Sequence, residues 1–392
     1  MVLHGELYRL RPDPRLLTTF YLCLSGGGAL GGLFVGLAAP LVFADYHELQ
    51  LSLSLGVFLL LAACWNDTVG WLHRGVAGWK WVVAVTPTVI LLGVWASSAV
   101  SRPGEVIRQE RSFFGVLRVL DEGSGRRAQR QLYSGTTLHG TQFQKWKQRP
   151  SSYYGTQAGI GIALLARPEG LDTEIGVVGL GIGTLAAYGR PGDRFRFYEI
   201  DRSVIQISRD EELFTYLSNT LGEVEIIEGD GRVRLAAELD QRDGPLFDIL
   251  VVDAFSSDAI PVHLLTREAF EIYARVIGKG LLAVHASSQH LDLVPVIARV
   301  GQSIGFDVLG IRNENFPSRL TKDSIWMFLS LDRSRISGLE RLVKRRAGIL
   351  DSGALEAFRI GPQRTRPAPL WTDDYSDLLR VVRPMGSPAR KP

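Results

Sequence analysis

Cysteine is scarce in this chain of 392 residues, which contains only Cys23 and Cys64, both in apolar stretches near the N-terminus. Disulfides and cysteine-based zinc sites are therefore excluded from the rest of the chain. The net charge is only +3 and no concentrated basic block is present, so nucleic-acid binding is not indicated. The histidines show no metal-ligand spacing, and we expect no metal.

Charged residues are missing from three long stretches, residues 16–44, 49–66 and 81–101. A helix needs about 20 mainly apolar residues to cross a bilayer, so each stretch is long enough. A cleaved signal peptide would have one short apolar core, whereas here the stretches follow one another. We therefore expect residues 1–104 to form a membrane anchor of about three transmembrane helices, with the lipid bilayer as a partner.

A glycine-rich turn organises the remainder of the chain. Residues 174–178 predict a buried strand, Gly179, Gly181 and Gly183 follow, and a helix is expected between this turn and a second predicted strand at residues 195–200. Glycines allow a ligand to approach the backbone, and an acidic side chain at the tip of the second strand can bind ribose hydroxyls. Glu199 and Asp201 occupy that tip. A nucleoside-containing cofactor is the first interpretation, and a tight turn without a ligand is the alternative.

The spacing of the turn is G-x-G-x-G, with Thr184 where a dinucleotide fold would have its third glycine. This departure weakens the pyrophosphate-binding interpretation, because that glycine belongs to the dinucleotide fingerprint. Adenosylmethionine-type cofactors carry no phosphate and suit the turn better.

Strands and helices alternate after this turn, which predicts an α/β domain with a parallel sheet and helices on both faces. Strands are expected at residues 224–228, 248–253, 281–286, 306–311 and 324–331, and helices at 159–166, 266–277 and 291–304. A small β-hairpin unit is expected at 105–150, with strands at 112–120, 127–133 and 136–142. We assign the α/β domain to residues 151–380 and a flexible tail to 381–392.

Acidic residues follow several of these predicted strands. Besides Glu199, these are Asp230 in EGDG and Asp253 with Asp258 in DAFSSD. The carboxyl ends of parallel strands meet at one edge of a sheet, where ligands bind. The sequence therefore predicts an acidic cleft at this edge, although a solvated surface position is the alternative for any single residue.

Several motifs together resemble the spermidine synthase family of polyamine aminopropyltransferases. They are GLGIGT, YEID, EGDGR, TLHGTQ and VVDAFSSDAIPVHLLT. The N-terminal LTTFYLCLSGGGALGGLFVGLAAPLVF and the late LWTDDYSDLL are similar to bacterial members in which transporter-like helices precede the synthase domain. The resemblance covers roughly residues 5–380. It implies the Rossmann-like sheet of adenosylmethionine-dependent methyltransferases, preceded by a β-hairpin unit.

The resemblance implies a transferase that moves an aminopropyl group from decarboxylated S-adenosylmethionine to a small-molecule amine such as putrescine. By this match Glu199 binds the ribose, Asp230 binds adenine, and Asp253 orients and deprotonates the amine. The remaining assignments are Gly179, Gly181, Gly183, Asp201 and Gly231 for the cofactor, Asp258 for catalysis, and His139, Tyr153, Tyr154, Asp373 and Asp374 for the substrate.

Two positions depart from the family. Ile182 stands where the family's turn has an aspartate, and the family's LDG is Tyr133–Gly135, YSG, here. Methyl transfer from S-adenosylmethionine itself, or a non-catalytic nucleoside-binding module attached to a transport-type membrane unit, are therefore the alternatives. We interpret His285, on a buried strand, as a core residue with its hydrogen bonds satisfied. His139 and His263 have functional and structural interpretations of equal weight.

The orientation of the anchor has two conflicting indications. Arg9, Arg11 and Arg15 precede the first span, which places the N-terminus inside and, with three spans, the α/β domain outside. Adenosylmethionine, however, is a cytosolic metabolite. We give the cofactor more weight and expect an integral protein of the bacterial inner (cell) membrane with its soluble domain in the cytoplasm. The sequence is compatible with a homo-oligomer.

Overall fold

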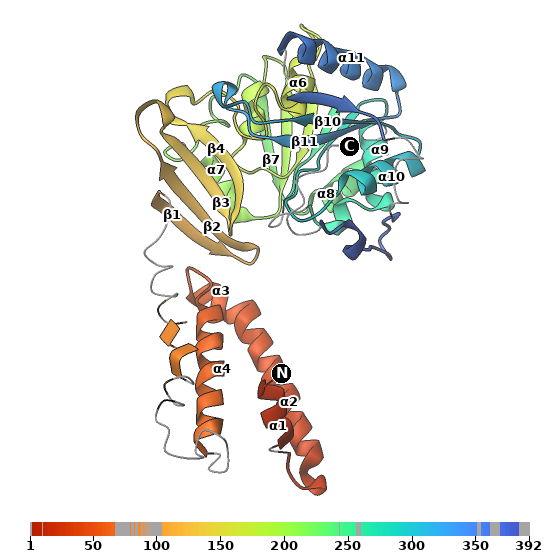
Figure 1. Cartoon of the computed structure of the whole chain (residues 1–392). Helices are drawn as coiled ribbons and strands as arrows, with labels where there is room; N and C mark the ends of the chain where they lie inside the picture. Colours follow the sequence, from red (N-terminus) through yellow and green to blue (C-terminus); the bar gives the residue numbers. More distant parts are fainter. Residues whose placement is uncertain are drawn as a thin grey trace. The chain divides into compact units, whose positions relative to one another are not determined.

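The computed structural model describes residues 2–9, 11–66, 104–242, 244–255, 260–350, 354–360 and 369–383, with a few single positions between 79 and 93 (Figure 1). The chain divides into two compact units. One contains Met1–Glu105 and Gln109–Val116, and the other contains Val106–Arg108 and Leu117–Pro392. Most of the expected span at 81–101, and residues 384–392 of the expected tail, lie outside the described residues.

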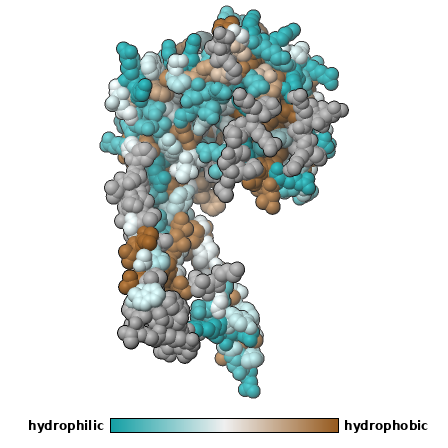
Figure 2. Space-filling model, in the orientation of Figure 1, coloured by the Kyte–Doolittle hydropathy of each residue, from teal (hydrophilic) through white to brown (hydrophobic). Residues whose placement is uncertain are grey.

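The first unit is mainly helical. After α1 (Val2–Arg9), the chain forms a continuous apolar helix, Pro14–Val42, of 29 residues, which contains an 18-residue stretch with mean hydropathy 1.7. It comprises η1 (Pro14–Leu16), α2 (Leu17–Leu33), the π-helical turn η2 (Phe34–Ala38) and α3 (Ala39–Val42). Helix α4 (His47–Asn66) follows, with a shorter apolar part, His47–Ala63. Among the described residues, one helix is thus long and apolar enough to cross a membrane, and hydrophobic side chains are exposed on this unit (Figure 2).

A buried ion pair connects two distant segments of the first unit. Arg111 donates to both carboxylate oxygens of Glu48 at 2.7 and 2.9 Å, and the two side chains are only 6% and 7% exposed. The guanidinium also lies over the Tyr46 ring, 5.1 Å from its centroid. The start of α4 is therefore bound to residues 109–112 of strand β1 (Glu105–Ser112), which belong to the same unit.

Four strands form the β unit, in the order β1-β2-β3-β4. After β1 these are β2 (Gly115–Glu122), β3 (Gln129–Ser134) and β4 (Thr137–Phe143). The predicted hairpin and third strand are confirmed, whereas β1 was missed because its EVIRQERS sequence has little apolar alternation.

An eight-stranded sheet forms the larger unit, in the order β12-β10-β11-β9-β8-β5-β6-β7. The five strands from β9 to β7 are parallel, as predicted. They are β5 (Glu174–Val178), β6 (Arg194–Glu199), β7 (Glu223–Glu228), β8 (Ile249–Val252) and β9 (Leu281–His285).

The prediction of a parallel arrangement is wrong for the other edge of the sheet. There β10 (Asp307–Asn313), β11 (Ser324–Ser330) and β12 (Leu355–Phe358) run antiparallel to their neighbours. The link from β10 to β11 contains only the short η7 (Pro317–Arg319), whereas a parallel pair needs a longer crossover connection.

Helices cover both faces of the sheet, and alternate residues of each strand supply the two cores. Ile175 and Val177 of β5 belong to a hydrophobic cluster with α6 (Gly159–Leu165), α7 (Arg202–Arg209) and α11 (Arg333–Leu350). Val178 belongs to the cluster on the opposite face, with α8 (Gly231–Leu239), α9 (Arg267–Ile277) and α10 (Val294–Ser303). The two-residue period of a strand explains this division. Helices α7, α8 and α11 were not predicted.

The strand order positions a crevice. From β5 the chain continues to β6 on one side of β5, and it later returns to β8 on the other side. The strand order therefore reverses beside β5. Such a point opens a ligand-binding crevice at the carboxyl ends of the strands. The glycine turn lies there and continues into a short 3₁₀ helix, η5 (Thr184–Tyr188), where an α-helix was expected. Gly189 and Pro191 follow directly and prevent its extension.

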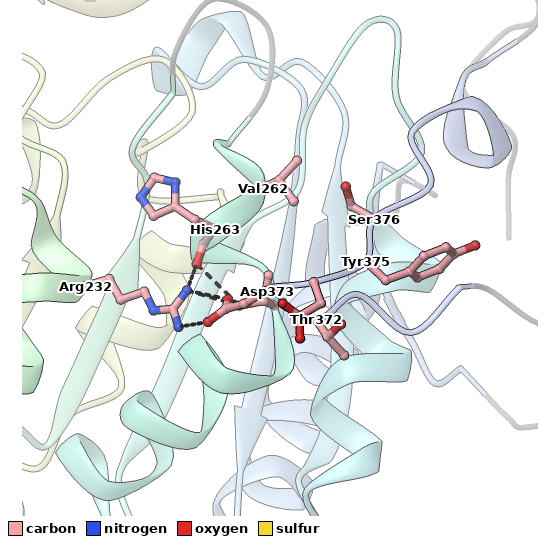
Figure 3. A pocket seen from close by; sticks show the side chains of 9 residues that line it. Arg232, Val262, His263, Thr372, Asp373, Tyr375 and Ser376 are labelled. Carbon is pink, nitrogen blue, oxygen red and sulfur yellow. Dashed lines mark hydrogen bonds and ion pairs between the residues drawn. The ribbon is translucent and has the colours of Figure 1, made fainter.

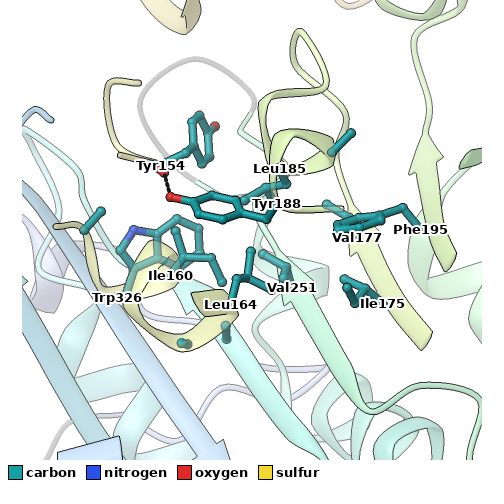
Figure 4. Packing of buried hydrophobic residues seen from close by; sticks show 14 of the residues in the cluster. Tyr154, Ile160, Leu164, Ile175, Val177, Leu185, Tyr188, Phe195, Val251 and Trp326 are labelled. Carbon is teal, nitrogen blue, oxygen red and sulfur yellow. Dashed lines mark hydrogen bonds between the residues drawn. The ribbon is translucent and has the colours of Figure 1, made fainter. Parts of the chain in front are cut away.

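Buried polar contacts hold the segment after this turn. Arg167, just after α6, donates to Tyr188 O at 2.7 Å and pairs with Asp193 at 2.8 Å, with side-chain exposures of 4% and 1%. Tyr188 in turn donates its hydroxyl to Tyr154 O at 2.6 Å (Figure 4). The segment preceding α6 and the end of the glycine turn are thereby connected.

We predict that Arg167→Ala lowers the free energy of unfolding by about 3–5 kcal/mol, because it leaves Asp193 as a buried charge without its cation. Urea unfolding followed by circular dichroism measures this change. Arg194→Ala is the control, since Arg194 pairs with Glu174 but is 61% exposed, and its loss should cost at most about 1 kcal/mol. Equal losses in the two variants would contradict the prediction.

Candidate cofactor and active site

The glycine turn has no room for side chains. Gly179, Gly181 and Gly183 have φ values of +100°, +55° and +74°. A Cβ atom on Gly179 would lie 2.5 Å from the backbone oxygen of Asp253, and one on Gly181 would lie 2.8 Å from that of His139. The turn thus packs directly against the ends of β8 and β4, and the predicted need for glycine has a steric cause.

The Glu199 carboxylate binds the backbone of the glycine turn. Its carboxylate accepts hydrogen bonds from Leu180 N at 3.0 Å and from Asp201 N at 2.9 Å. Burial raises the pKa of this carboxyl group, and the backbone donors oppose that effect. Each carboxylate oxygen has about two lone-pair sites, so these backbone bonds do not use the whole acceptor capacity of the carboxylate. This arrangement suits a vicinal diol such as that of ribose.

Three further predicted cofactor residues have visible structural roles. Asp201 accepts from Ser203 N at 2.9 Å and caps α7. Asp230 caps α8 through Val233 N at 3.0 Å, and its second oxygen lies 2.9 Å from His263 Nε2. Gly231 allows α8 to approach β5, because a Cβ atom there would lie 2.6 Å from Val178 Cγ1. Of the three, Asp230 has a partially exposed carboxylate with a polar neighbour.

Asp253 and His285 form a buried pair at the ends of β8 and β9. Asp253 Oδ1 lies 2.7 Å from His285 Nδ1, and the side chains are 7% and 4% exposed. The interpretation of His285 as a satisfied core residue is wrong, because its Nε2 is buried and has no hydrogen-bond partner among the described residues. The sequence signal was available: His285 ends a strand at the same edge of the sheet as Asp253.

Aromatic rings surround this pair. His285 stacks on Trp326 with ring centroids 4.3 Å apart and planes 6° apart, and the rings of Tyr153 and Tyr154 lie 5.5 and 6.4 Å from it. Trp326 comes from β11 and was not identified from the sequence. Tyr153 and Tyr154, which were assigned to the substrate, therefore lie beside the pair.

His139 and Tyr154 are both electrostatically coupled to Asp253. Burial raises the pKa of Tyr154 well above its usual value, with a further contribution from Asp253. Burial lowers the pKa of His139, against the effect of the same carboxylate, and His139 Nε2 has no partner among the described residues. The structure thus brings four of the predicted site residues together: Asp253, Tyr153, Tyr154 and His139. Asp258, the second predicted catalytic residue, lies outside the described residues.

Ile182, at the family's aspartate position, is a core residue. It is 1% exposed and packs under Gly140 of β4, where an added Cβ would lie 2.5 Å from Ile182 Cγ1. A carboxylate at this position would be buried among apolar atoms at a high free-energy cost. The position therefore contributes packing between β4 and the glycine turn.

Asp373 and Asp374 line a different feature, a pocket of about 380 Å³ between α8, η6 (Val262–Leu264) and the segment 372–376 (Figure 3). Asp373 forms two hydrogen bonds with Arg232, at 2.7 and 2.6 Å, and accepts from Thr266 Oγ1 at 2.8 Å. These donors hold the pKa of Asp373 below its usual value. Because Arg232 already neutralises this carboxylate, we do not include it in the amine site.

Comparisons with known proteins identify solved structures only, since no family model and no curated protein matches. A probable spermidine synthase from Corynebacterium glutamicum is 16% identical, with 68% of this chain and 99% of that chain covered and a TM-score of 0.46. Spermidine synthase from Thermotoga maritima is 14% identical, with 61% of this chain and 78% of that chain covered and a TM-score of 0.43. A TehB-like SAM-dependent methyltransferase from Corynebacterium glutamicum is 16% identical, with 44% of this chain and 86% of that chain covered and a TM-score of 0.30.

At these identities and TM-scores the likeness carries no argument about activity. The fold class follows from the strand order itself, with five parallel strands, β5 central among them, and an antiparallel edge. This is the Rossmann-like α/β sheet of the adenosylmethionine-dependent methyltransferase type, preceded by a small β unit. Among the described residues, no group of histidine, cysteine or acidic side chains is arranged to hold a metal ion.

We predict that Gly179→Ala lowers the free energy of unfolding by at least about 3 kcal/mol, because backbone strain adds to overpacking against Asp253. Gly170→Ala is a matched control: Gly170 also has positive φ, +75°, but an added Cβ meets nothing within 4 Å. It should cost only about 1–2 kcal/mol. Thermal and urea unfolding compare the two, and similar losses would show that the close approach does not matter.

Proposed function

We propose that this chain is a transferase that binds an adenosylmethionine-type co-substrate at the carboxyl ends of β5, β6 and β7, and transfers its aminopropyl group to an amine. The observation that carries this proposal is the buried Asp253 carboxylate, which lies beside the glycine turn and pairs with His285, an imidazole surrounded by aromatic rings. The motif DAFSSDAIPVHLLT, which contains Asp253, supports the same assignment through its resemblance to aminopropyltransferases.

The chain offers matched groups for an adenosine moiety. Glu199 would bind the two ribose hydroxyls through its remaining lone pairs, and Asp230 would accept a hydrogen bond from the adenine amino group. Gly179 and Gly181 would line the part derived from methionine, as the family resemblance implies. No phosphate site is needed for such a ligand.

The chemical step requires an unprotonated amine. Its nitrogen attacks the carbon next to the sulfonium, the new nitrogen–carbon bond forms, and the electron pair of the broken carbon–sulfur bond returns to sulfur. A protonated amine has no lone pair for this attack, so the site must attract the cation and then remove a proton. Asp253 supplies the negative charge, and the rings of Tyr153 and Tyr154, which lie beside the Asp253–His285 pair, would attract a cation.

Methyl transfer from S-adenosylmethionine is the second candidate function, and the buried Ile182 favours it. The family's aspartate at that position is replaced by a core side chain, so the described residues offer one carboxylate near the reacting centre. A non-catalytic nucleoside-binding module is the third candidate. Assays of aminopropyl and methyl transfer, together with binding measurements, separate the three.

Glu199→Gln should weaken binding of methylthioadenosine, the nucleoside product, about tenfold or more. The variant loses charge-assisted hydrogen bonds, each of which contributes about 1.5–3 kcal/mol. Isothermal titration calorimetry measures the dissociation constant. Glu228→Gln is the control, because Glu228 is an exposed carboxylate that ends the neighbouring strand β7. Unchanged affinity in Glu199→Gln would reject the ribose assignment.

Asp253→Asn should lower the turnover rate about 100-fold to 10,000-fold, which is the usual contribution of acid–base catalysis, and leave methylthioadenosine affinity nearly unchanged. Transfer of a labelled aminopropyl group to putrescine, spermidine and simple monoamines checks this outcome. If Asp253→Asn retains whatever transfer the native protein shows, Asp253 has no role in the chemical step.

We also propose that the chain is an integral protein of the bacterial cell membrane, anchored by three spans, with its α/β domain in the cytoplasm. The apolar helix Pro14–Val42 supports this proposal. The protein should stay with membranes in alkaline carbonate and be released by detergent. Extraction by carbonate alone would contradict the anchor, and a C-terminal reporter active only outside the cytoplasm would contradict the orientation.

A further inference from the structure

We propose that His285 takes the proton from the attacking amine, while Asp253 acts through His285 as a positioning and charge-stabilising residue. This inference rests on the proposed transferase function and assigns the proton acceptor within it. The first observation is the pair itself, with Asp253 Oδ1 2.7 Å from His285 Nδ1. A carboxylate accepts the Nδ1 proton and so fixes the tautomer in which Nε2 is bare and basic.

The second observation is independent of the pair. His285 Nε2 is buried and has no partner among the described residues, in a side chain that is 4% exposed. Buried polar atoms in proteins are nearly always hydrogen-bonded, and exceptions occur at catalytic sites. A substrate N–H group would satisfy this nitrogen.

The surroundings favour a transient imidazolium. The Trp326 ring lies parallel to the imidazole, 4.3 Å away between centroids, and would stabilise a cation through its π face. Phe255 contacts the same imidazole edge-on, with centroids 5.0 Å apart. These rings also hold the imidazole in one orientation.

Three more titratable side chains lie in this cluster: His139 from β4, and Tyr153 and Tyr154 from the segment before α6. Burial lowers the pKa of His139 and raises that of Tyr154, so both are neutral near pH 7. Asp253 therefore supplies the negative charge for a protonated His285.

The step balances without another reactant. The ammonium group of the acceptor transfers one proton to His285 Nε2, which becomes an imidazolium paired with Asp253. The freed lone pair forms the bond to carbon, and the carbon–sulfur pair leaves with sulfur as a neutral thioether. The imidazolium then releases its proton to solvent as the product leaves.

His285→Asn separates the hydrogen bond to Asp253 from proton acceptance at Nε2. The asparagine amide can still donate to Asp253 in place of Nδ1, but nothing replaces Nε2. We expect the single-turnover rate to fall at least about 100-fold, the methylthioadenosine dissociation constant to stay within about twofold, and added imidazole to restore part of the rate. His290→Asn is the control, because His290 is an exposed histidine that follows β9.

Aminopropyl and methyl transfer are measured side by side. If the native protein transfers methyl groups but no aminopropyl groups, aminopropyl transfer is rejected as the function. Loss of that methyl transfer in His285→Asn would still support His285 as the proton acceptor. Native-like transfer in His285→Asn, or equal loss of rate and nucleoside affinity, would overturn the inference.

A direct readout needs no turnover. In protein labelled with ¹⁵N-histidine, the His285 signal is identified by its absence from His285→Asn. We expect protonated Nδ1 and bare Nε2, with a change at Nε2 when propylamine is added in the presence of methylthioadenosine. A proton on Nε2 in the free protein, or no response to the amine, would overturn the inference even if the native enzyme shows no transfer.

Discussion

The site depends on the close approach of the glycine turn to the end of β8. Gly179 follows β5 and its Cα atom lies against the backbone of Asp253, with no space for a methyl group between them. Asp253 N donates to Val178 O at 2.8 Å, and Gly179 N donates to Tyr198 O at the same distance. These two bonds extend the sheet by one residue on each side of β5. Asp253 and the start of the glycine turn are thus placed by backbone hydrogen bonding.

Much of this arrangement could be predicted from the sequence. The parallel strands, the glycine turn and the acidic residues at strand ends follow from local patterns, and the structure confirms the strands and the turn. The antiparallel edge could not be predicted, because strand direction depends on how the chain returns to the sheet. Helices α7 and α8 were missed because they are short, although the acidic caps Asp201 and Asp230 are signals of a helix start.

The site itself was predicted less completely than the sheet. Asp253 was identified from its motif and Tyr154 was assigned to the substrate, and the structure places them together. His285 and Trp326 were missed because each lies on a buried strand, where an apolar environment is the ordinary explanation. Their proximity comes from the antiparallel pairing of β11 with β9, which sets Trp326 opposite His285. Pairing of this kind leaves no signal within either segment.

The ion pair between Glu48 and Arg111 has a consequence for membrane insertion. Its partners are separated by 63 positions, and the segment between them contains α4 and the apolar residues 81–101. If α4 crosses a bilayer, the chain must cross again before Arg111 for the two charges to meet on one side. An omitted or inverted span would leave each charge without its partner. The pair therefore forms only when the chain crosses the bilayer an even number of times between Glu48 and Arg111.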